Sequence, residues 1–223
     1  MEKLINKEIS DQLKTIFKDL PEPVQILFFN SKTQNCDYCE QTYQLLSEIV
    51  ELSDQMALES YDIEADAEVA KRYQVERVPG IVIASRKDNI VLDSGVKFSG
   101  IPAGHEFSSL ISAITLVSNG NSGLSEETRQ WLSTLDQPVH LQVFVTTTCP
   151  YCPNAVTLAH RMALENKNIQ AEMVVASEFY DLSNEYGVPG VPHTVIKYGK
   201  GEVVGADPEG MLIEEMKRDL SMN

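Results

Sequence analysis

The stretch from Thr147 to Pro153 reads TTCPYCP and places two thiols, Cys149 and Cys152, three residues apart. It follows the apolar run Val139–Val145, which predicts a buried strand, and precedes residues 154–165, which predict a helix. A cysteine at the start of a helix faces free backbone N–H groups and the positive end of the helix dipole, which stabilise a thiolate. We therefore expect Cys149 to attack disulfides and Cys152, one turn further in, to resolve the mixed disulfide.

The same arrangement occurs earlier, where CDYC spans Cys36 to Cys39 after the apolar run Val24–Phe29. By its position we expect Cys36 to attack and Cys39 to resolve. These four are all the cysteines of the chain. Two Cys-x-x-Cys pairs in a chain too long to need structural bridges indicate either redox chemistry or a zinc site.

An internal repeat relates the two pairs. An offset of 113 residues places Cys36 on Cys149 and Cys39 on Cys152. The same offset places Val78-Pro79 on Val191-Pro192, and an apolar-rich run follows each Val-Pro. This coincidence indicates two copies of one domain.

We assign the copies to residues 1–118 and 119–223, with a linker at the breaker-rich segment 119–123. In the first copy, helical and strand patterns cover residues 10–20, 24–29, from 36 onward, 61–63, 66–73, 80–84, 90–92 and 103–117, with a hairpin turn at 85–89. In the second they cover residues 125–135, 139–145, from 149 onward, 171–175, 178–186, 193–197, 202–204 and from 208 onward. Strands alternating with helices in this way predict an α/β fold.

Composition excludes several classes of function. The formal net charge of the 223-residue chain is −15, which argues against nucleic acid or an anionic membrane as a partner. Residues 1–14 lack the basic start and apolar centre of a signal peptide, and no apolar stretch approaches the length of a membrane span. We therefore expect a cytoplasmic protein.

A strand, a Cys-x-x-Cys at a helix start and a Val-Pro before a further strand resemble the thioredoxin/glutaredoxin family. The residues that carry this resemblance are Cys36, Cys39, Pro79, Cys149, Cys152 and Pro192. The tandem whole is similar to the two-domain protein disulfide oxidoreductases of thermophilic bacteria and archaea. The resemblance implies two tandem thioredoxin-like domains, each a central mixed sheet flanked by helices, with cis peptide bonds before both prolines.

The resemblance also implies an activity, namely dithiol–disulfide exchange on protein substrates by reduction, formation or isomerisation of their disulfides. The redox-active groups would be the disulfides Cys36–Cys39 and Cys149–Cys152, with no bound cofactor or metal. No Gly-x-Gly-x-x-Gly run occurs, so a separate thioredoxin-reductase-like flavoprotein would supply electrons for reduction.

Several residues beside the cysteines are candidate substrate contacts. A cis Xaa–Pro bond leaves the backbone of the preceding residue free to pair with an extended substrate, which implicates Val78, Pro79, Val191 and Pro192. Tyr38 and Tyr151 stand between the paired cysteines, where they contact substrate or form the wall of the site. His193 follows Pro192 and is expected as a non-catalytic polar residue at the rim of the groove beside Cys149.

The two sites are predicted to be unequal. Asp37 directly follows Cys36, and a neighbouring carboxylate disfavours a thiolate, whereas Pro150 after Cys149 adds no charge. We therefore expect Cys149 to have the lower pKa and its pair to be the more oxidising.

Three alternatives remain open. A tandem thioredoxin module also relays electrons between a flavoprotein reductase and a peroxiredoxin. Four thiolates from two Cys-x-x-Cys pairs could instead bind zinc. The chain could also be a peptide-binding chaperone in which the thiols are secondary.

Overall fold

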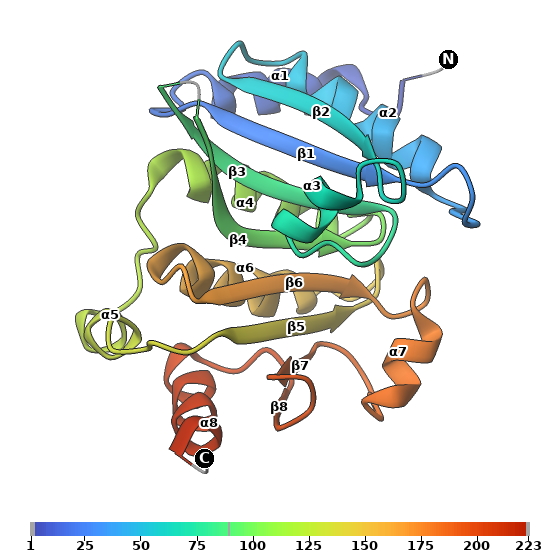
Figure 1. Cartoon of the computed structure of the whole chain (residues 1–223). Helices are drawn as coiled ribbons and strands as arrows, with labels where there is room; N and C mark the ends of the chain where they lie inside the picture. The colour runs from blue at the N-terminus through green and yellow to red at the C-terminus, as the bar shows by residue number, and fades with distance from the viewer. Residues whose placement is uncertain (1–2, 89, 222–223) are drawn as a thin grey trace.

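The computed structural model describes residues 3–88 and 90–221, within which it contains eight helices and eight strands (Figure 1). The elements of the first half are α1 Lys7–Phe17, β1 Val24–Asn30, α2 Cys39–Val50, β2 Met56–Asp62, α3 Ala67–Arg72, β3 Gly80–Lys87, β4 Ile90–Ser99 and α4 Glu106–Asn119. Those of the second half are α5 Glu126–Leu132, β5 Val139–Val145, α6 Cys152–Glu165, β6 Ile169–Val175, α7 Tyr180–Glu185, β7 His193–Ile196, β8 Gly201–Val204 and α8 Glu209–Ser221. The predicted α/β class is confirmed.

The two halves repeat the same pairing of strands, which confirms the internal repeat. In the first half β1 is parallel to β2 and antiparallel to β3, and β3 is antiparallel to β4. In the second half β5, β6, β7 and β8 pair in the same way. The predicted boundary between residues 118 and 119 falls in the last turn of α4 and stays a prediction.

A single mixed sheet runs through both halves in the order β2-β1-β3-β4-β6-β5-β7-β8. The halves join where β4 lies parallel to β6, with Val96 opposite Ala171 and Ser99 opposite Val174. Backbone hydrogen bonds therefore connect the two domains, and what the sequence presented as two sheets is one.

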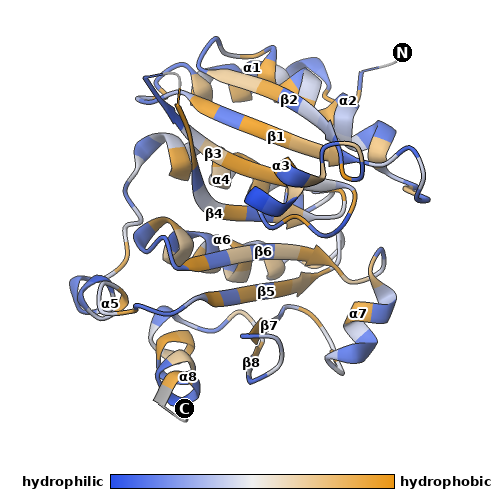
Figure 2. Ribbon diagram, in the orientation of Figure 1, coloured by the Kyte–Doolittle hydropathy of each residue, from blue (hydrophilic) through white to orange (hydrophobic). Residues whose placement is uncertain are grey.

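Helices cover the two faces of this sheet unequally (Figure 1). One continuous apolar core lies under α1, α2, α4, α5, α6 and α8 and extends across both halves. On the opposite face, α3 and α7 each cover a smaller separate cluster. Figure 2 shows the apolar residues concentrated on the strands between these layers. Burial of this area is the main favourable contribution to folding.

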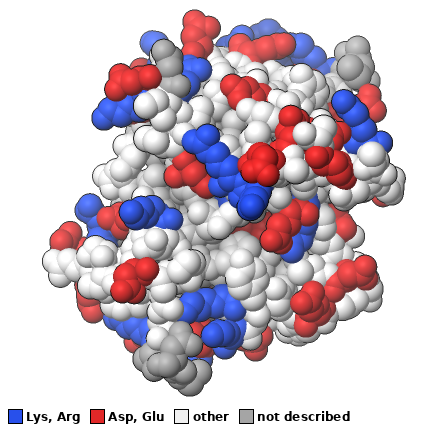
Figure 3. Space-filling model, in the orientation of Figure 1, with Lys and Arg blue, Asp and Glu red and all other residues white. Residues whose placement is uncertain are grey.

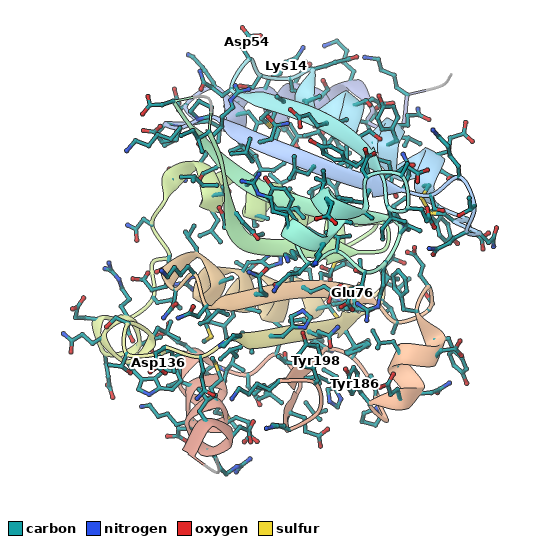
Figure 4. The ribbon with its side chains drawn as sticks, in the orientation of Figure 1. Lys14, Asp54, Glu76, Asp136, Tyr186 and Tyr198 are labelled. Carbon is teal, nitrogen blue, oxygen red and sulfur yellow. A yellow bond between two sulfur atoms is a disulfide. The ribbon has the colours of Figure 1, made fainter. Side chains whose placement is uncertain are left out.

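Between α3 and α7 the second face of the sheet is polar. Successive side chains of a strand point to opposite faces, so along β4 Val96 and Phe98 enter the continuous core. Lys97 of β4 lines a cavity on the other side, with Glu172 of β6. We call the group Lys97, Ser99, His140, Gln142 and Glu172 the polar seam. Glu76 from the first half and Tyr198 from the second, both labelled in Figure 4, line a cavity of about 240 Å³ at this seam.

The structure also corrects several predicted boundaries. β2 begins at Met56 rather than at residue 61, because it pairs with β1 along its whole length although its middle is partly exposed. β3 continues to Lys87 and so includes most of the predicted turn 85–89, of which Asn89 lies outside the described residues. The linker at 119–123 is held in place, because Arg161 donates hydrogen bonds to the carbonyl oxygens of Ser122 and Gly123.

Charged side chains of both signs are mixed on one face of the molecule. The face drawn in Figure 3 carries interspersed acidic and basic side chains. Of the helices formed by residues 3–88 and 90–221, none has both the length and the apolar character needed to cross a bilayer.

Candidate redox sites

The second site forms where the chain leaves β5 and enters α6. Cys149 and Cys152 are joined by a disulfide, with their Cα atoms 5.5 Å apart. α6 begins at Cys152, so the predicted start at Cys149 is wrong by three residues. Cys149 instead lies in the turn before the helix, where the N–H of Cys152 donates a hydrogen bond of 3.1 Å to Cys149 Sγ. The first helical amide therefore points at the sulfur atom that would carry negative charge.

The first site repeats this arrangement at the end of β1. Cys36 and Cys39 form a disulfide, again with 5.5 Å between their Cα atoms, and α2 begins at Cys39. Here the N–H of Cys39 points to the carbonyl oxygen of Cys36, at 3.4 Å. The loop before the pair is held by Ser31 Oγ, which donates to the Glu64 carboxylate at 2.9 Å. The two sites therefore share the same arrangement but differ in the acceptor of the first helical N–H, which is a sulfur atom at the second site and a carbonyl oxygen at the first.

The two sites differ in exposure and charge. The residue Cys149 is 8% exposed and Cys152 is fully buried, whereas Cys36 and Cys39 are both partly exposed. α2 carries Glu40 in its first turn, and the first turn of α6 has no acidic residue. Glu40 therefore adds to Asp37 as a negative group near Cys36. The lower pKa at Cys149 stays a prediction, with a further observation in its favour.

Both Val-Pro bonds are cis, as expected. Pro79 directly precedes β3, whose first residue lies opposite Phe29 near the end of β1. Pro192 precedes β7, which lies opposite Phe144 near the end of β5 in the same way. Each cis-proline therefore lies at the end of the sheet where β1 or β5 leads into a cysteine pair.

The valines before these prolines contact the same apolar clusters as the cysteines. Cys36 and Cys39 pack against the cluster that contains Val78. Val191 packs against the continuous core, which includes Cys149 and Cys152. Tyr38 and Tyr151 are 43% and 68% exposed, so both side chains are accessible beside their disulfides. Val78 and the first cysteine pair thus share one small cluster, whereas Val191 and the second pair share only the continuous core, and the role of these residues as substrate contacts stays a prediction.

Both sites lie at the same end of the sheet, beyond the C-terminal ends of β1 and β5. β1 is antiparallel to β3 and β3 to β4, while β4, β6 and β5 are parallel to one another, so β1 and β5 point the same way. Four strand steps of about 4.8 Å separate β1 from β5, about 19 Å in all. The two pairs are therefore too far apart to share a zinc ion, whose bonds to sulfur are about 2.3 Å long. Within the described chain, no group of three or more His, Cys, Asp or Glu side chains could hold a metal.

His193 differs from its expected place at the rim. It is fully buried at the start of β7, and its Nε2 lies 3.2 Å from Glu202 Oε2. Burial lowers the pKa of His193, while Glu202 raises it, and the net direction is downward. A buried imidazole whose pKa is lowered is less able to supply the positive charge that a rim position would have offered to Cys149.

A buried carboxyl group near the second site was not predicted. Glu106, the first residue of α4, is fully buried, and its Oε2 accepts a hydrogen bond of 2.6 Å from Ser109. The preceding residue, His105, donates its N–H to the carbonyl oxygen of Thr147, two residues before Cys149. Gly104 allows this approach, because its φ is +59° and a Cβ there would overlap the Thr147 oxygen. A glutamate at the start of a helix is usually exposed, so no pattern in the sequence singled it out.

Replacing Glu106 with glutamine is expected to stabilise the protein at pH 8 and to leave it nearly unchanged at pH 4. Burial raises the pKa of Glu106 from 4.5 to about 7, against a smaller opposing effect of the Ser109 hydrogen bond. The folded state therefore holds its proton more tightly than the unfolded state. Stability from this group is present below pH 4.5 and is lost as pH rises to about 7, a change on the order of 3 kcal/mol.

Urea unfolding of the wild type and of Glu106→Gln between pH 4 and pH 8 measures this difference. Ser109→Ala is the matched control, because it removes the hydrogen bond and keeps the ionisable group. If the stability of the wild type changed between pH 5 and pH 7 in parallel with that of Glu106→Gln, the raised pKa of Glu106 would be contradicted.

Comparisons with known proteins agree with this geometry. The family profile of the thioredoxin domain matches residues 24–112 and 139–217. A solved protein disulfide oxidoreductase from Aeropyrum pernix is 32% identical, with a TM-score of 0.84 over 94% of this chain and 90% of that one. The NTD_N/C domain of alkylhydroperoxide reductase from Enterococcus faecalis is 28% identical, with a TM-score of 0.85 over 94% of this chain and 98% of that one.

A curated relative is much longer than this chain. This relative, an alkyl hydroperoxide reductase of Staphylococcus aureus, is 27% identical over 205 residues, which are 92% of this chain and 37% of that protein. The chain therefore spans a little over a third of the length of that relative.

Proposed function

Because this chain belongs to the thioredoxin-domain family and has two Cys-x-x-Cys disulfides, it is a dithiol–disulfide oxidoreductase, and we propose that it acts on disulfides of other proteins. The observation that supports this substrate class is the exposed aromatic side chain within each cysteine pair, since Tyr38 and Tyr151 are 43% and 68% exposed. Exposed apolar side chains beside the disulfides offer contacts to a polypeptide chain. A small disulfide would have little use for them.

The proposed reaction transfers two electrons from one dithiol to one substrate disulfide. The thiolate of Cys149 or Cys36 attacks a substrate sulfur, which forms a mixed disulfide and releases the first substrate thiolate. Cys152 or Cys39 then attacks the sulfur of its partner cysteine. This step closes the disulfide in the chain and releases the second thiolate, and the two protons of the dithiol end on the substrate thiols. Disulfide formation in a substrate is the same sequence in reverse.

Electrons for net reduction must come from another molecule. The proposed donor is a separate flavoprotein of the thioredoxin-reductase type, and the proposed compartment is the cytoplasm, where such donors keep thiols reduced. Dithiothreitol replaces that donor in an assay.

The wild type is expected to reduce insulin disulfides with dithiothreitol as donor, and Cys39→Ser/Cys152→Ser is expected to accumulate mixed disulfides instead. In this variant each attacking thiol remains and no resolving thiol can release the substrate. Mass spectrometry after incubation with insulin would show adducts at Cys36 and Cys149. A protein that reduces 2-hydroxyethyl disulfide but neither reduces insulin nor forms these adducts would have small disulfides as its substrates.

A second candidate function is suggested by the similarity to the alkyl hydroperoxide reductase of Staphylococcus aureus. In that case the chain would pass electrons from a flavoprotein to a peroxide-reducing partner. The test combines a thioredoxin reductase, this chain and a peroxiredoxin, and follows NADPH consumption after addition of hydroperoxide. Consumption that requires this chain and its cysteines would favour the relay over reduction of many proteins.

A further inference from the structure

An apolar cavity of about 530 Å³ lies between the two redox sites. Tyr38, from within the first cysteine pair, lines it on one side, and Thr147, two residues before Cys149, lines it on the other. The rest of the wall includes Leu45 of α2 and Phe107 of α4. We call this cavity the inter-site groove.

The groove is open to solvent through residues that are themselves exposed. Leu4 and Ile9 line it and are 50% and 36% exposed, and Tyr38 is 43% exposed. Exposed apolar side chains that continue into an apolar cavity are characteristic of a binding surface. Because Tyr38 and Thr147 belong to the two redox loops, a ligand in the groove would also lie beside both disulfides.

Acidic groups from both halves lie near the groove. Glu178 lines it and accepts a hydrogen bond of 2.9 Å from the N–H of Ile101. Burial raises the pKa of Glu178, and the nearby charge of Asp37 raises it further. Asp37 directly precedes Tyr38, and Tyr38 and Glu178 both line the groove, so carboxyl groups from different halves lie at the same cavity and repel each other. A cationic side chain placed between them would relieve this repulsion.

We propose that one extended polypeptide substrate lies across both redox sites, with an apolar side chain in the inter-site groove and a lysine or arginine near Asp37 and Glu178. This inference rests on the proposed function and specifies its substrate class. The strands that lead into the two sites, β1 and β5, are about 19 Å apart across the sheet, and an extended chain advances about 3.3 Å per residue. Cysteines about six residues apart in one substrate would therefore meet Cys36 and Cys149 together.

The experiment uses Cys39→Ser/Cys152→Ser, which leaves one thiol at each site. The probe is a peptide with two cysteines six residues apart, both activated as 2-pyridyl disulfides, with a leucine and an arginine between them. Each protein thiolate attacks the peptide sulfur, forms a mixed disulfide and releases one 2-thiopyridone. Intact-mass measurement distinguishes one peptide bound through two disulfides from one bound through a single disulfide. A second peptide has its cysteines two residues apart.

The six-residue peptide is expected to give mainly the doubly linked 1:1 adduct, and the two-residue peptide mainly singly linked adducts. Replacing the leucine with aspartate is expected to slow formation of the second link about tenfold, because the groove would no longer bury an apolar side chain. Equal double linking for both spacings would overturn the inference. A peptide with one activated cysteine tests each site separately, so failure of both thiols to react would instead count against the proposed function.

Groove variants make the test specific. Phe107→Asp and Leu4→Asp are expected to remove the advantage of leucine over aspartate, and Leu4 is exposed enough that its replacement does not threaten folding. Met211→Asp is the control, since Met211 is 53% exposed on α8 and does not line the groove. A leucine advantage that survives both groove variants would show that the peptide binds elsewhere.

Discussion

Replacing Cys149 with serine is expected to remove most of the insulin-reducing turnover, and replacing Cys36 is expected to remove the smaller part. The Cys152 N–H points at Cys149 Sγ, and α6 has no acidic residue in its first turn. Cys36 has Asp37 beside it and Glu40 in the following turn. At a pH below both thiol pKa values, each unit by which the pKa of Cys149 lies below that of Cys36 gives about tenfold more thiolate at Cys149. The more acidic thiol is also the weaker nucleophile, and this offsets about half of the gain on a logarithmic scale. A pKa difference of one unit would therefore give about a threefold difference in rate between the sites.

The measurement is insulin reduction with dithiothreitol as donor, together with thiolate absorbance against pH. The titrations use Cys36→Ser/Cys39→Ser and Cys149→Ser/Cys152→Ser, so that each protein reports on one pair. The pKa of Cys149 should be the lower of the two. A greater loss of turnover in Cys36→Ser would mean that the greater exposure of Cys36 outweighs the stabilisation of the Cys149 thiolate.

Replacing Glu172 with alanine is expected to destabilise the protein by about 3–5 kcal/mol. The Glu172 side chain is buried in the polar seam, where Oε1 lies 3.3 Å from Arg77 Nη1 and Oε2 lies 3.2 Å from His140 Nε2. Gln142 and Ser99 also donate hydrogen bonds to it. Alanine would leave these donors without their acceptor in the middle of the sheet, and the Arg77 charge would keep only Glu76, whose Oε2 lies 3.5 Å from Nη2.

Acid should weaken the same interaction. Burial alone would raise the pKa of Glu172, but the hydrogen bond and charge of His140, with Arg77 and Ser99, lower it from 4.5 to about 2. The stability that this group contributes is therefore complete above pH 4.5 and is lost as pH falls toward 2, on the order of 3 kcal/mol. Glu172→Ala should lack this loss of stability as the pH falls.

Urea unfolding at pH 7 and pH 3 measures both effects. Asp11→Ala is the matched control, because it breaks an exposed ion pair with Lys7 and should change stability little. Arg77 also directly precedes Val78-Pro79. Turnover at the first site should therefore fall in Glu172→Ala more than turnover at the second. Destabilisation no larger than that of the control would contradict the role assigned to the seam.

The redox sites could be predicted from sequence because their signals are local and occur twice. Two Cys-x-x-Cys pairs and two Val-Pro pairs at one offset indicated the repeat, and the family resemblance that these residues carry implied the cis bonds and the disulfides. The start of each helix was placed three residues early, since spacing alone does not reveal that the first cysteine remains in the turn.

The joint between the halves could not be predicted in the same way. It depends on the register of β4 against β6, where Lys97 lies opposite Glu172. A lysine and a glutamate in mid-strand suggest a solvated face, whereas here both are buried. Glu106 was missed for a related reason, because it is buried at the start of α4, beside the contact that His105 makes with Thr147 of the second half. In each case a polar side chain is buried beside a segment distant in sequence.

The joint also bears on self-assembly. The halves are related head to tail, since β4 of the first copy meets β6, the counterpart of β2, in the second. Such a contact is heterologous and does not close, so a long, unprotected strand in the place of β8 would accept β2 of another molecule and fibres would grow. β8 has only four residues where β4 has ten, and it carries Glu202. A short, charged terminal strand is a recognised defence against edge pairing. The shortened second hairpin thus leaves a short terminal strand with a charged side chain, and this disfavours pairing of β8 with β2 of another molecule.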